Sequence, residues 1–239
     1  MDKIKIRAIV LKEILIGEAD KLIVLLAKGM GKITVKARGA RNAKSKTACG
    51  ASVFSYCDYI AVKTKAGYSI TQAEPIKSFY EIGNDIEKLA YASAAVEIAE
   101  KVCSQDQPDD DNMFLLLNML NNVASGKTAP RTAFLIYLIK FLNNYGCMPE
   151  TSCDCGEKAE YCGESGFYCR KCRKPHNIYV SDLACELINT IIGEDIKHCF
   201  DFVIGEELLS RAEKAAKLIF FGNIDVKIRS WDFTEKFSK

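Results

Sequence analysis

The opening residues of the chain alternate apolar and polar positions with a period of two, which predicts β-strands. Gly29-Met30-Gly31 provides a tight turn between two of them. The expected strands are Lys3–Ile16, Lys21–Lys28, Gly31–Arg38, Tyr56–Thr64 and Tyr68–Ala73. The second is apolar enough to be buried on both faces. Five antiparallel strands in this length predict a small closed barrel of the OB type, which we expect to end at Pro75.

From Asp85 onward the apolar spacing changes to the 3.6-residue period of helices. The expected helices are Asp85–Cys103, a second capped by Asp109–Asp111 and running through Val123, Thr128–Tyr145, a fourth capped by Ser181 and running to Ile192, and Glu206–Phe221. Gly146 and Gly222 are suited to end helices, and the tail Val226–Phe233 alternates weakly, which favours an extended segment.

Between Gly146 and Asn177 the helical period disappears and cysteines appear. The predicted fold class is therefore α+β: a five-stranded OB-fold barrel followed by an α-helical domain with a zinc-ribbon-like insert. We expect the barrel to occupy residues 1–80, the helical domain 81–239 and the insert about 147–178.

Hydrophobic residues make up 49% of the chain, enough to bury a core. The longest apolar runs, Leu22–Ala27 and Ala133–Ile139, are far shorter than the ~20 residues of a membrane span. The N-terminus alternates like a strand and lacks the apolar block of a signal peptide. We therefore expect a cytoplasmic protein without membrane partners.

Charge is distributed unevenly, although the net charge is only +2. Residues 1–80 carry fifteen Lys and Arg against six Asp and Glu, whereas residues 81–239 carry eighteen against twenty-five. A run of seven basic residues without an intervening acid lies within the first part: Lys28, Lys32, Lys36, Arg38, Arg41, Lys44 and Lys46. A local field of this kind favours polyanions, with nucleic acid as the first candidate.

Lys32, Lys36 and Arg38 share one strand face by period-two geometry, and Arg41, Lys44 and Lys46 lie in the following loop, Gly39–Ser52. Such a surface can follow a phosphate backbone, as in OB folds that bind single strands. The alternative is a solvated strand face with lysines that block aggregation. The aromatic residues of the barrel, Phe54, Tyr56, Tyr59 and Tyr68, are expected in the core. Binding is expected to be largely independent of base sequence, because nothing in this pattern reads base edges.

The insert contains two cysteine pairs, Cys153-x-Cys155 and Cys169-x-x-Cys172, separated by thirteen residues. Two pairs that fold back on one another form a tetrahedral thiolate site for zinc, with a structural role because no coordination position is left open. Cys147, Cys162 and His176 are close enough in sequence to replace a ligand, and a loop of unliganded cysteines is the alternative. The remaining cysteines, at 49, 57, 103, 185 and 199, are expected in the core.

Signals of catalysis are weak. Gly126-Lys127-Thr128 lacks the earlier glycine of a phosphate-binding loop, Asp109–Asp111 fit a helix N-terminus, and His176 and His198 have no catalytic partners in the sequence. We expect no enzyme and no small-molecule substrate.

Several short motifs resemble the RecO family of bacterial recombination mediators. They are Leu11-Lys12, Gly17-Glu18-Ala19-Asp20, Gly31-Lys32-Ile33-Thr34, Gly39-Ala40-Arg41, Ile70–Glu74, Tyr145-Gly146 with Pro149, and the cysteine insert. The resemblance is strongest in residues 1–80 and weak after about residue 180. Family members usually carry Cys-x-x-Cys as the first pair, where this chain has Cys153-x-Cys155.

The resemblance implies an OB barrel, a helical domain and a zinc-ribbon-like insert. It implies binding of single- and double-stranded DNA, annealing of complementary strands, and action with RecR to help RecA displace single-strand-binding protein during recombinational repair. The family's basic barrel residues correspond by motif position to Lys32, Lys36, Arg38 and Arg41. Such a protein would be associated with the bacterial nucleoid.

Three other functions fit parts of the sequence. A protein-interaction scaffold would use the basic barrel for an acidic partner, such as the tail of single-strand-binding protein. An RNA-binding OB protein would use the same surface. A nuclease is disfavoured because the sequence shows no carboxylate cluster or open metal site.

Overall fold

The computed structural model describes residues 3–65 and 67–237. Contacts divide the chain into two compact units. One contains the barrel through Ile86 together with Val96–Phe114, and the other contains Glu87–Ala95 together with the chain from Leu115 onward.

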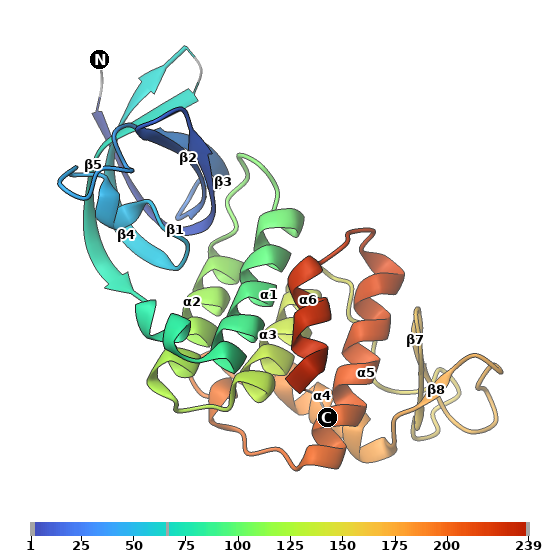
Figure 1. The fold of residues 1–239 in the computed structure, drawn as a ribbon. Coiled ribbons are helices and arrows are strands. Elements are labelled where there is room, and N and C mark those ends of the chain that lie inside the picture. Colours follow the sequence, from blue (N-terminus) through green and yellow to red (C-terminus); the bar gives the residue numbers. More distant parts are fainter. Residues whose placement is uncertain (1–2, 66, 238–239) are drawn as a thin grey trace. The chain divides into compact units, whose positions relative to one another are not determined.

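The barrel is built from β1 (Lys3–Ile16), β2 (Asp20–Ala27), β3 (Gly31–Ala37), β4 (Ser55–Thr64) and β5 (Gly67–Ser78), drawn in blue to cyan in Figure 1. Its closed strand order is β1-β2-β3-β5-β4, as in OB folds. β1 pairs with β4 along its first half and with β2 along its second. A register shift between Val10 and Lys12 lets the strand bend from one partner to the other. β3 and β5 pair in parallel, whereas the other four pairs of barrel strands are antiparallel in the described residues.

Alternation along the strands builds the barrel core. Ile33, Val35 and Ala37 of β3 are buried, whereas the intervening Lys32 and Lys36 remain partly exposed. The run Ile23–Ala27 of β2 is buried on both faces, as its composition predicted. Each large apolar side chain buried here contributes roughly 1.5–3 kcal/mol to folding. The inward-facing Tyr59 keeps its hydroxyl satisfied by donating to the Gly50 carbonyl at 2.8 Å.

The expectation that the barrel ends at Pro75 is wrong. β5 continues to Ser78, and the ladder to β4 shifts its register between Tyr56 and Cys57, with Cys57 opposite Pro75. Proline lacks an N–H, so it is tolerated where the ladder is already irregular. Of the four aromatic residues expected in the core, only Tyr59 is fully buried, and Phe54, Tyr56 and Tyr68 are half-buried.

The helices are α1 (Ile86–Val102), α2 (Asp110–Ser125), α3 (Pro130–Asn144), α4 (Asp182–Gly193), α5 (Glu206–Asn223) and α6 (Arg229–Thr234). Helix α3 is the centre of the second unit, with almost every residue from Arg131 to Leu142 buried. Pro130 occupies its first turn, where a missing N–H costs nothing. Ser181 caps α4 by accepting a hydrogen bond from the Ala184 amide, as expected.

The tail is helical from Arg229 onward, in α6, which corrects the expectation of an extended segment for that part of Val226–Phe233; Ile228 before it is extended. Trp231 of α6 is buried against Phe134 and Phe220, with ring centroids 5.3 Å apart in each pair. Burying this indole stabilises a conformation that the local pattern did not indicate. Helix α5 likewise continues through Gly222 to Asn223 instead of ending at the glycine.

The cysteine-rich segment forms a small three-stranded sheet of order β7-β6-β8, made of β6 (Tyr161–Gly163), β7 (Gly166–Tyr168) and β8 (Ile178–Tyr179). Among the other cysteines, 57, 103, 185 and 199 are buried as expected, but Cys49 is exposed. No helix in the described ranges combines the length and apolar character needed to cross a membrane.

Candidate nucleic-acid interface and metal centre

Four cysteines meet beside the small sheet. The Sγ atoms of Cys153, Cys155, Cys169 and Cys172 all lie within 4.8 Å of one another. The first pair stands in a turn closed by a hydrogen bond from the Gly156 amide to the Cys153 carbonyl, and Gly156 permits it with φ +84°. Cys169 follows β7 directly, and its carbonyl accepts from the Arg173 amide, which turns the chain back at the second pair.

The sulfur geometry suits a metal ion. Cys155 Sγ lies 3.4 Å from Cys153 Sγ and 3.6 Å from Cys169 Sγ. A tetrahedron with metal–sulfur bonds of about 2.3 Å has edges of about 3.8 Å, so only small movements would place all four sulfurs around one ion. The four cysteines can therefore hold a metal.

Electrostatics in the cluster fit the same interpretation. Backbone amides of Cys155 and Cys169 lower the pKa of Cys153 to about 7, while hydrogen bonds with the other sulfurs raise the pKa of Cys172 to about 12. Four negatively charged thiolates at these distances repel one another strongly unless a cation lies between them. A divalent ion removes this conflict by stabilising all four as thiolates.

The alternative ligands named from the sequence lie outside the cluster of described residues. Cys162 is buried on β6 near the Gly163 carbonyl, Cys147 contacts the Tyr145 carbonyl, and His176 is exposed.

The seven basic residues of the barrel fall into two groups. The first comprises Arg38 at the end of β3 and Arg41, Lys44 and Lys46 in the following loop, all exposed. Arg41 fixes the loop to the β1–β2 turn: its amide donates to the Ala19 carbonyl and its guanidinium to the Gly17 carbonyl. None of these four pairs with a carboxylate within the described residues.

The second group, Lys28 and Lys32, contacts Val96–Phe114 of the same unit (the α1–α2 segment). Lys32 Nζ donates to the Glu100 carbonyl at 2.5 Å, and Lys28 Nζ lies 5.6 Å from the centre of the Phe114 ring. The backbone of Lys32 also bonds to this segment, donating to Ser104 and accepting from Asp106. These lysines help hold the segment against the barrel.

Lys36 stands between the groups and pairs with Asp20 at 2.8 Å. The hydrogen bond from Lys36 is the main reason that the pKa of Asp20 is lowered, and the Gly39 amide adds to it. A solvent-screened pair of this kind is weak, so a phosphate can compete for the ammonium group. Arg7 of β1 is likewise paired, because its guanidinium donates two hydrogen bonds to the Asp58 carboxylate.

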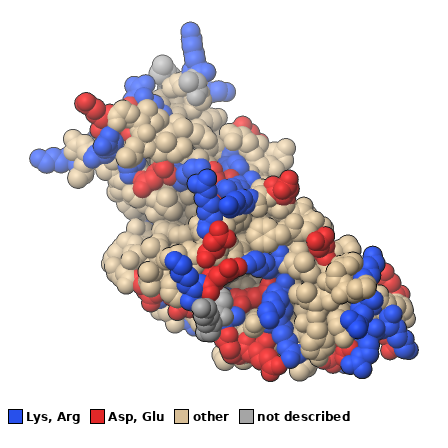
Figure 2. Space-filling model, turned by 45° about the vertical axis from the view of Figure 1, so that its right-hand side comes forward, with Lys and Arg blue, Asp and Glu red and all other residues tan. Residues whose placement is uncertain are grey.

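A groove of about 640 Å³ includes Arg38 of the first group in its lining. The lining also includes Thr34 and Lys36 of β3, Tyr68 of β5, and Gln105 and Asp106 from the α1–α2 segment. The sequence did not indicate the last two, because they lie far along the chain from the barrel strands that they meet. The distribution of charge is seen in Figure 2, where Lys and Arg side chains project from the surface and acidic side chains lie among many of them.

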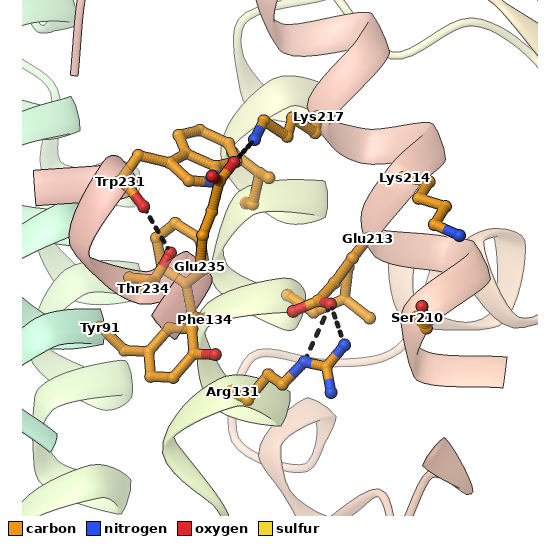
Figure 3. A pocket seen from close by; sticks show the side chains of 12 residues that line it. Tyr91, Arg131, Phe134, Ser210, Glu213, Lys214, Lys217, Trp231, Thr234 and Glu235 are labelled. Atoms are coloured by element: carbon orange, nitrogen blue, oxygen red, sulfur yellow. Dashed lines mark hydrogen bonds and ion pairs between the residues drawn. The ribbon is translucent and has the colours of Figure 1, made fainter. Parts of the chain in front are cut away.

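The helical unit has a pocket of its own, with a volume of about 220 Å³ (Figure 3). Arg131 enters it from α3 and binds Glu213 and Glu206 of α5, while Trp231 and Phe134 form an apolar wall. Burial raises the pKa of Glu213, although Arg131 opposes that shift. Sequence reasoning missed this pocket because its residues come from four separate helices.

The chain matches two family models in succession. Residues 1–79 match the N-terminal domain of recombination protein O, and residues 83–232 match its C-terminal domain. Together these matches cover nearly all of the sequence.

Curated relatives match over nearly the whole chain. DNA repair protein RecO of Acetivibrio thermocellus is 29% identical over 98% of this chain and 96% of its own length. DNA repair protein RecO of Alkaliphilus metalliredigens is 27% identical over 98% and 99%, and that of Caldanaerobacter subterraneus 30% identical over 72% of each. The barrel, the helical unit and these matches agree, and the chain belongs to the recombination protein O (RecO) family of DNA repair proteins.

Proposed function

We propose that this protein is a non-catalytic DNA-binding protein that anneals complementary strands. With RecR, it would help load recombinase onto DNA coated by single-strand-binding protein. The observation that supports this most strongly is the exposed group Arg38, Arg41, Lys44 and Lys46. None of the four forms an ion pair with a carboxylate in the described residues, and Arg38 lines a groove. The protein would act in the cytoplasm, associated with the nucleoid.

The mechanism is electrostatic. Phosphates of single- or double-stranded DNA would bind Arg38, Arg41, Lys44 and Lys46, with Lys36 joining when it exchanges Asp20 for a phosphate. Lys28 and Lys32 belong to the proposed surface as well, but their present contacts suggest a smaller contribution. Neutralising two strands at once lowers their mutual repulsion, so complementary strands can meet.

The four cysteines would hold one zinc ion with a structural role. Thiolates are the preferred ligands of zinc, and all four positions of a tetrahedron would be filled by protein. Bound zinc would fix the two chain reversals of the insert. The domain limits that we propose are 1–80, 81–239 and, for the insert, 147–178.

The test replaces Arg38, Lys44 and Lys46 together with alanine, because these side chains have no intramolecular hydrogen bond or ion pair in the described structure. Affinity for a single-stranded oligonucleotide should fall, and the slope of log affinity against log salt should decrease by about 2, since each phosphate contact adds about 0.7. A charge-matched control replaces Lys127, Lys197 and Lys236 of the helical unit.

The proposal is wrong if the barrel variant keeps both its affinity and its salt slope. Little binding of naked oligonucleotide by the unmodified protein would instead indicate an interaction scaffold for an acidic protein tail. Stronger binding to RNA than to DNA of the same sequence would indicate an RNA-binding protein.

A further inference from the structure

Three tyrosines form a row across the small sheet of the cysteine-rich segment. Tyr161 of β6 lies directly opposite Tyr168 of β7 on one side and Tyr179 of β8 on the other. Directly opposite residues of paired strands project from the same face. The sheet therefore places three aromatic rings side by side.

The two faces of this sheet differ. Cys162 and Phe167, which alternate with the tyrosines, are buried, and so the opposite face packs against the helical unit. On the tyrosine face, Tyr161 and Tyr168 are half-buried and Tyr179 is 50% exposed. The rings of Tyr161 and Tyr179 meet edge to face with centroids 5.4 Å apart.

Two arginines cover this row. The guanidinium of Arg173 lies 4.8 Å from the centre of the Tyr161 ring, and that of Arg211 of α5 lies 5.1 Å from the centre of the Tyr179 ring. Both arginines reach the rings from outside the sheet, one from the cysteine turn and one from a helix. Arginine planes and aromatic rings are the groups on which unstacked bases lie in single-strand binding proteins.

Basic residues continue beside the row. Arg170, Lys171, Arg173 and Lys174 surround Cys172, and all four are exposed. Lys171 pairs weakly with Glu157 at 3.6 Å, and Arg211 pairs with Glu207. No carboxylate pairs with Arg170, Arg173 or Lys174 within the described part of the chain.

A purely structural role explains only part of this arrangement. Stacked arginines would help to cover a sheet that is too small to have a core of its own. That role does not require four exposed cations next to the row, nor does it leave half of Tyr179 open to solvent. Exposed aromatic rings can stack with bases, and unpaired cations can bind phosphates. Single-stranded nucleic acid needs both kinds of contact.

We propose that the tyrosine row and its basic turn form a second binding surface, for single-stranded nucleic acid. Bases would stack on the half of Tyr179 that is open to solvent and on the guanidinium plane of Arg211 that lies over its ring, and phosphates would bind Arg170, Arg173 and Lys174. This inference rests on the proposed DNA-binding function, but it uses residues entirely outside the barrel.

The test uses the full-length, zinc-loaded protein with a short oligothymidylate. Tyr179→Ala combined with Arg173→Gln should weaken binding about tenfold, the effect expected for one lost stacking contact and one lost phosphate contact. Tyr179→Phe, which keeps the ring, should bind normally. Tyr80→Ala removes a 71% exposed aromatic residue from elsewhere and serves as the matched control.

A second measurement uses the unmodified protein, so its result does not depend on whether a variant folds. Photo-crosslinking of the unmodified protein to an oligonucleotide with 5-iodouracil should give adducts on the peptides that contain Tyr161 or Tyr179. Normal affinity of the double variant, or adducts confined to the barrel, would overturn the inference and leave the proposed function intact. Absence of any oligonucleotide binding by the unmodified protein would overturn both, and preferential capture of an acidic peptide at this surface would overturn the inference alone.

Discussion

At the scale of single residues, Gly31 shows how the barrel and the α1–α2 segment come together within one unit. Its φ is +72°, and a Cβ at this position would lie 1.7 Å from the Gln107 carbonyl oxygen. The backbone of Gln107 therefore occupies the space that a side chain at position 31 would need, and backbone atoms cannot rotate away as a flexible side chain can. Gly29 has almost the same φ, +69°, but nothing lies within 4 Å of its Cβ position.

These two glycines give a matched pair of variants. Gly29→Ala should lower the free energy of unfolding by about 1–2 kcal/mol, the cost of a left-handed conformation for alanine. Gly31→Ala should lower the free energy of unfolding by about 1–3 kcal/mol more than Gly29→Ala does, because the clash with Gln107 adds overpacking to the backbone strain. Urea denaturation measures both. An equal loss of free energy of unfolding in the two variants would show that the close approach of Gln107 to Gly31 does not affect stability.

Arg131 is the second residue whose replacement should change stability, because it is the cationic partner of the partly buried carboxylate of Glu213. Its side chain is only 9% exposed and binds Glu213, whose side chain is 22% exposed. Burial raises the pKa of Glu213 despite this pairing. Removing the cation would leave a charge without compensation.

Arg131→Met should therefore lower the free energy of unfolding at neutral pH by about 3–5 kcal/mol. The pKa of Glu213 in the folded state, already raised, should rise further, so the folded state binds the proton more tightly than the unfolded state does. Stability lost at neutral pH should then be partly regained as the pH falls through that pKa. Thermal unfolding between pH 7 and pH 5 measures this.

Arg211→Met, at a pair with the exposed Glu207, should cost less than about 1 kcal/mol and show no such recovery.

At the scale of elements, the cysteine-rich insert shows how spacing along the chain becomes a site. The paired cysteines were recognisable from the sequence, and the structure brings their sulfurs together. What the spacing left open was the identity of the fourth ligand. Burial of Cys162 on β6 and the outward position of His176 remove both from the cluster, for reasons of packing.

We expect Cys172→Ser to lose most of the bound zinc, measured by metal analysis of the purified protein. The loss should be accompanied by a lower melting temperature, because metal binding is coupled to folding of such inserts. Cys49→Ser, at an exposed cysteine outside the cluster, should keep its zinc. Full zinc content in Cys172→Ser would show that another residue takes its place.

At the scale of the whole molecule, charge and fold together support a DNA-binding role. The basic surplus is local to the barrel strands and their loop. The compact unit that also includes Val96–Phe114 carries sixteen Lys and Arg against fourteen Asp and Glu, and the helical unit carries seventeen of each. A polyanion would therefore be attracted by the local group Arg38, Arg41, Lys44 and Lys46 and not by the net charge of either unit.

Complementary oligonucleotides coated with single-strand-binding protein should anneal faster when the unmodified protein is added. The variant that lacks Arg38, Lys44 and Lys46 should lose most of this acceleration, whereas the Lys127, Lys197 and Lys236 control should keep it. Strand annealing can be followed by fluorescence transfer between labels. Shortening of the labelled strands in the presence of Mg²⁺ would contradict a non-catalytic role and favour the nuclease interpretation.

The sequence by itself determined the five strands of the barrel, most helices and the paired cysteines, because each depends on short-range spacing. Alternation in β3 fixed which residues face the barrel core, and Ser181 marked the start of α4. The same local reasoning failed at Pro75, at Gly222 and in the tail. In the tail, packing of Trp231 against residues nearly a hundred positions away determines the conformation.

Only the tertiary structure decided which charges remain available. Local alternation placed Lys32, Lys36 and Arg38 on one face, but Lys32 turned out to contact Glu100 and Lys36 to pair with Asp20. The tyrosine row likewise exists only through strand pairing across the small sheet. Strand alternation is a local property of the backbone, whereas compensation of a charge depends on which distant groups the fold brings within a few ångströms of it.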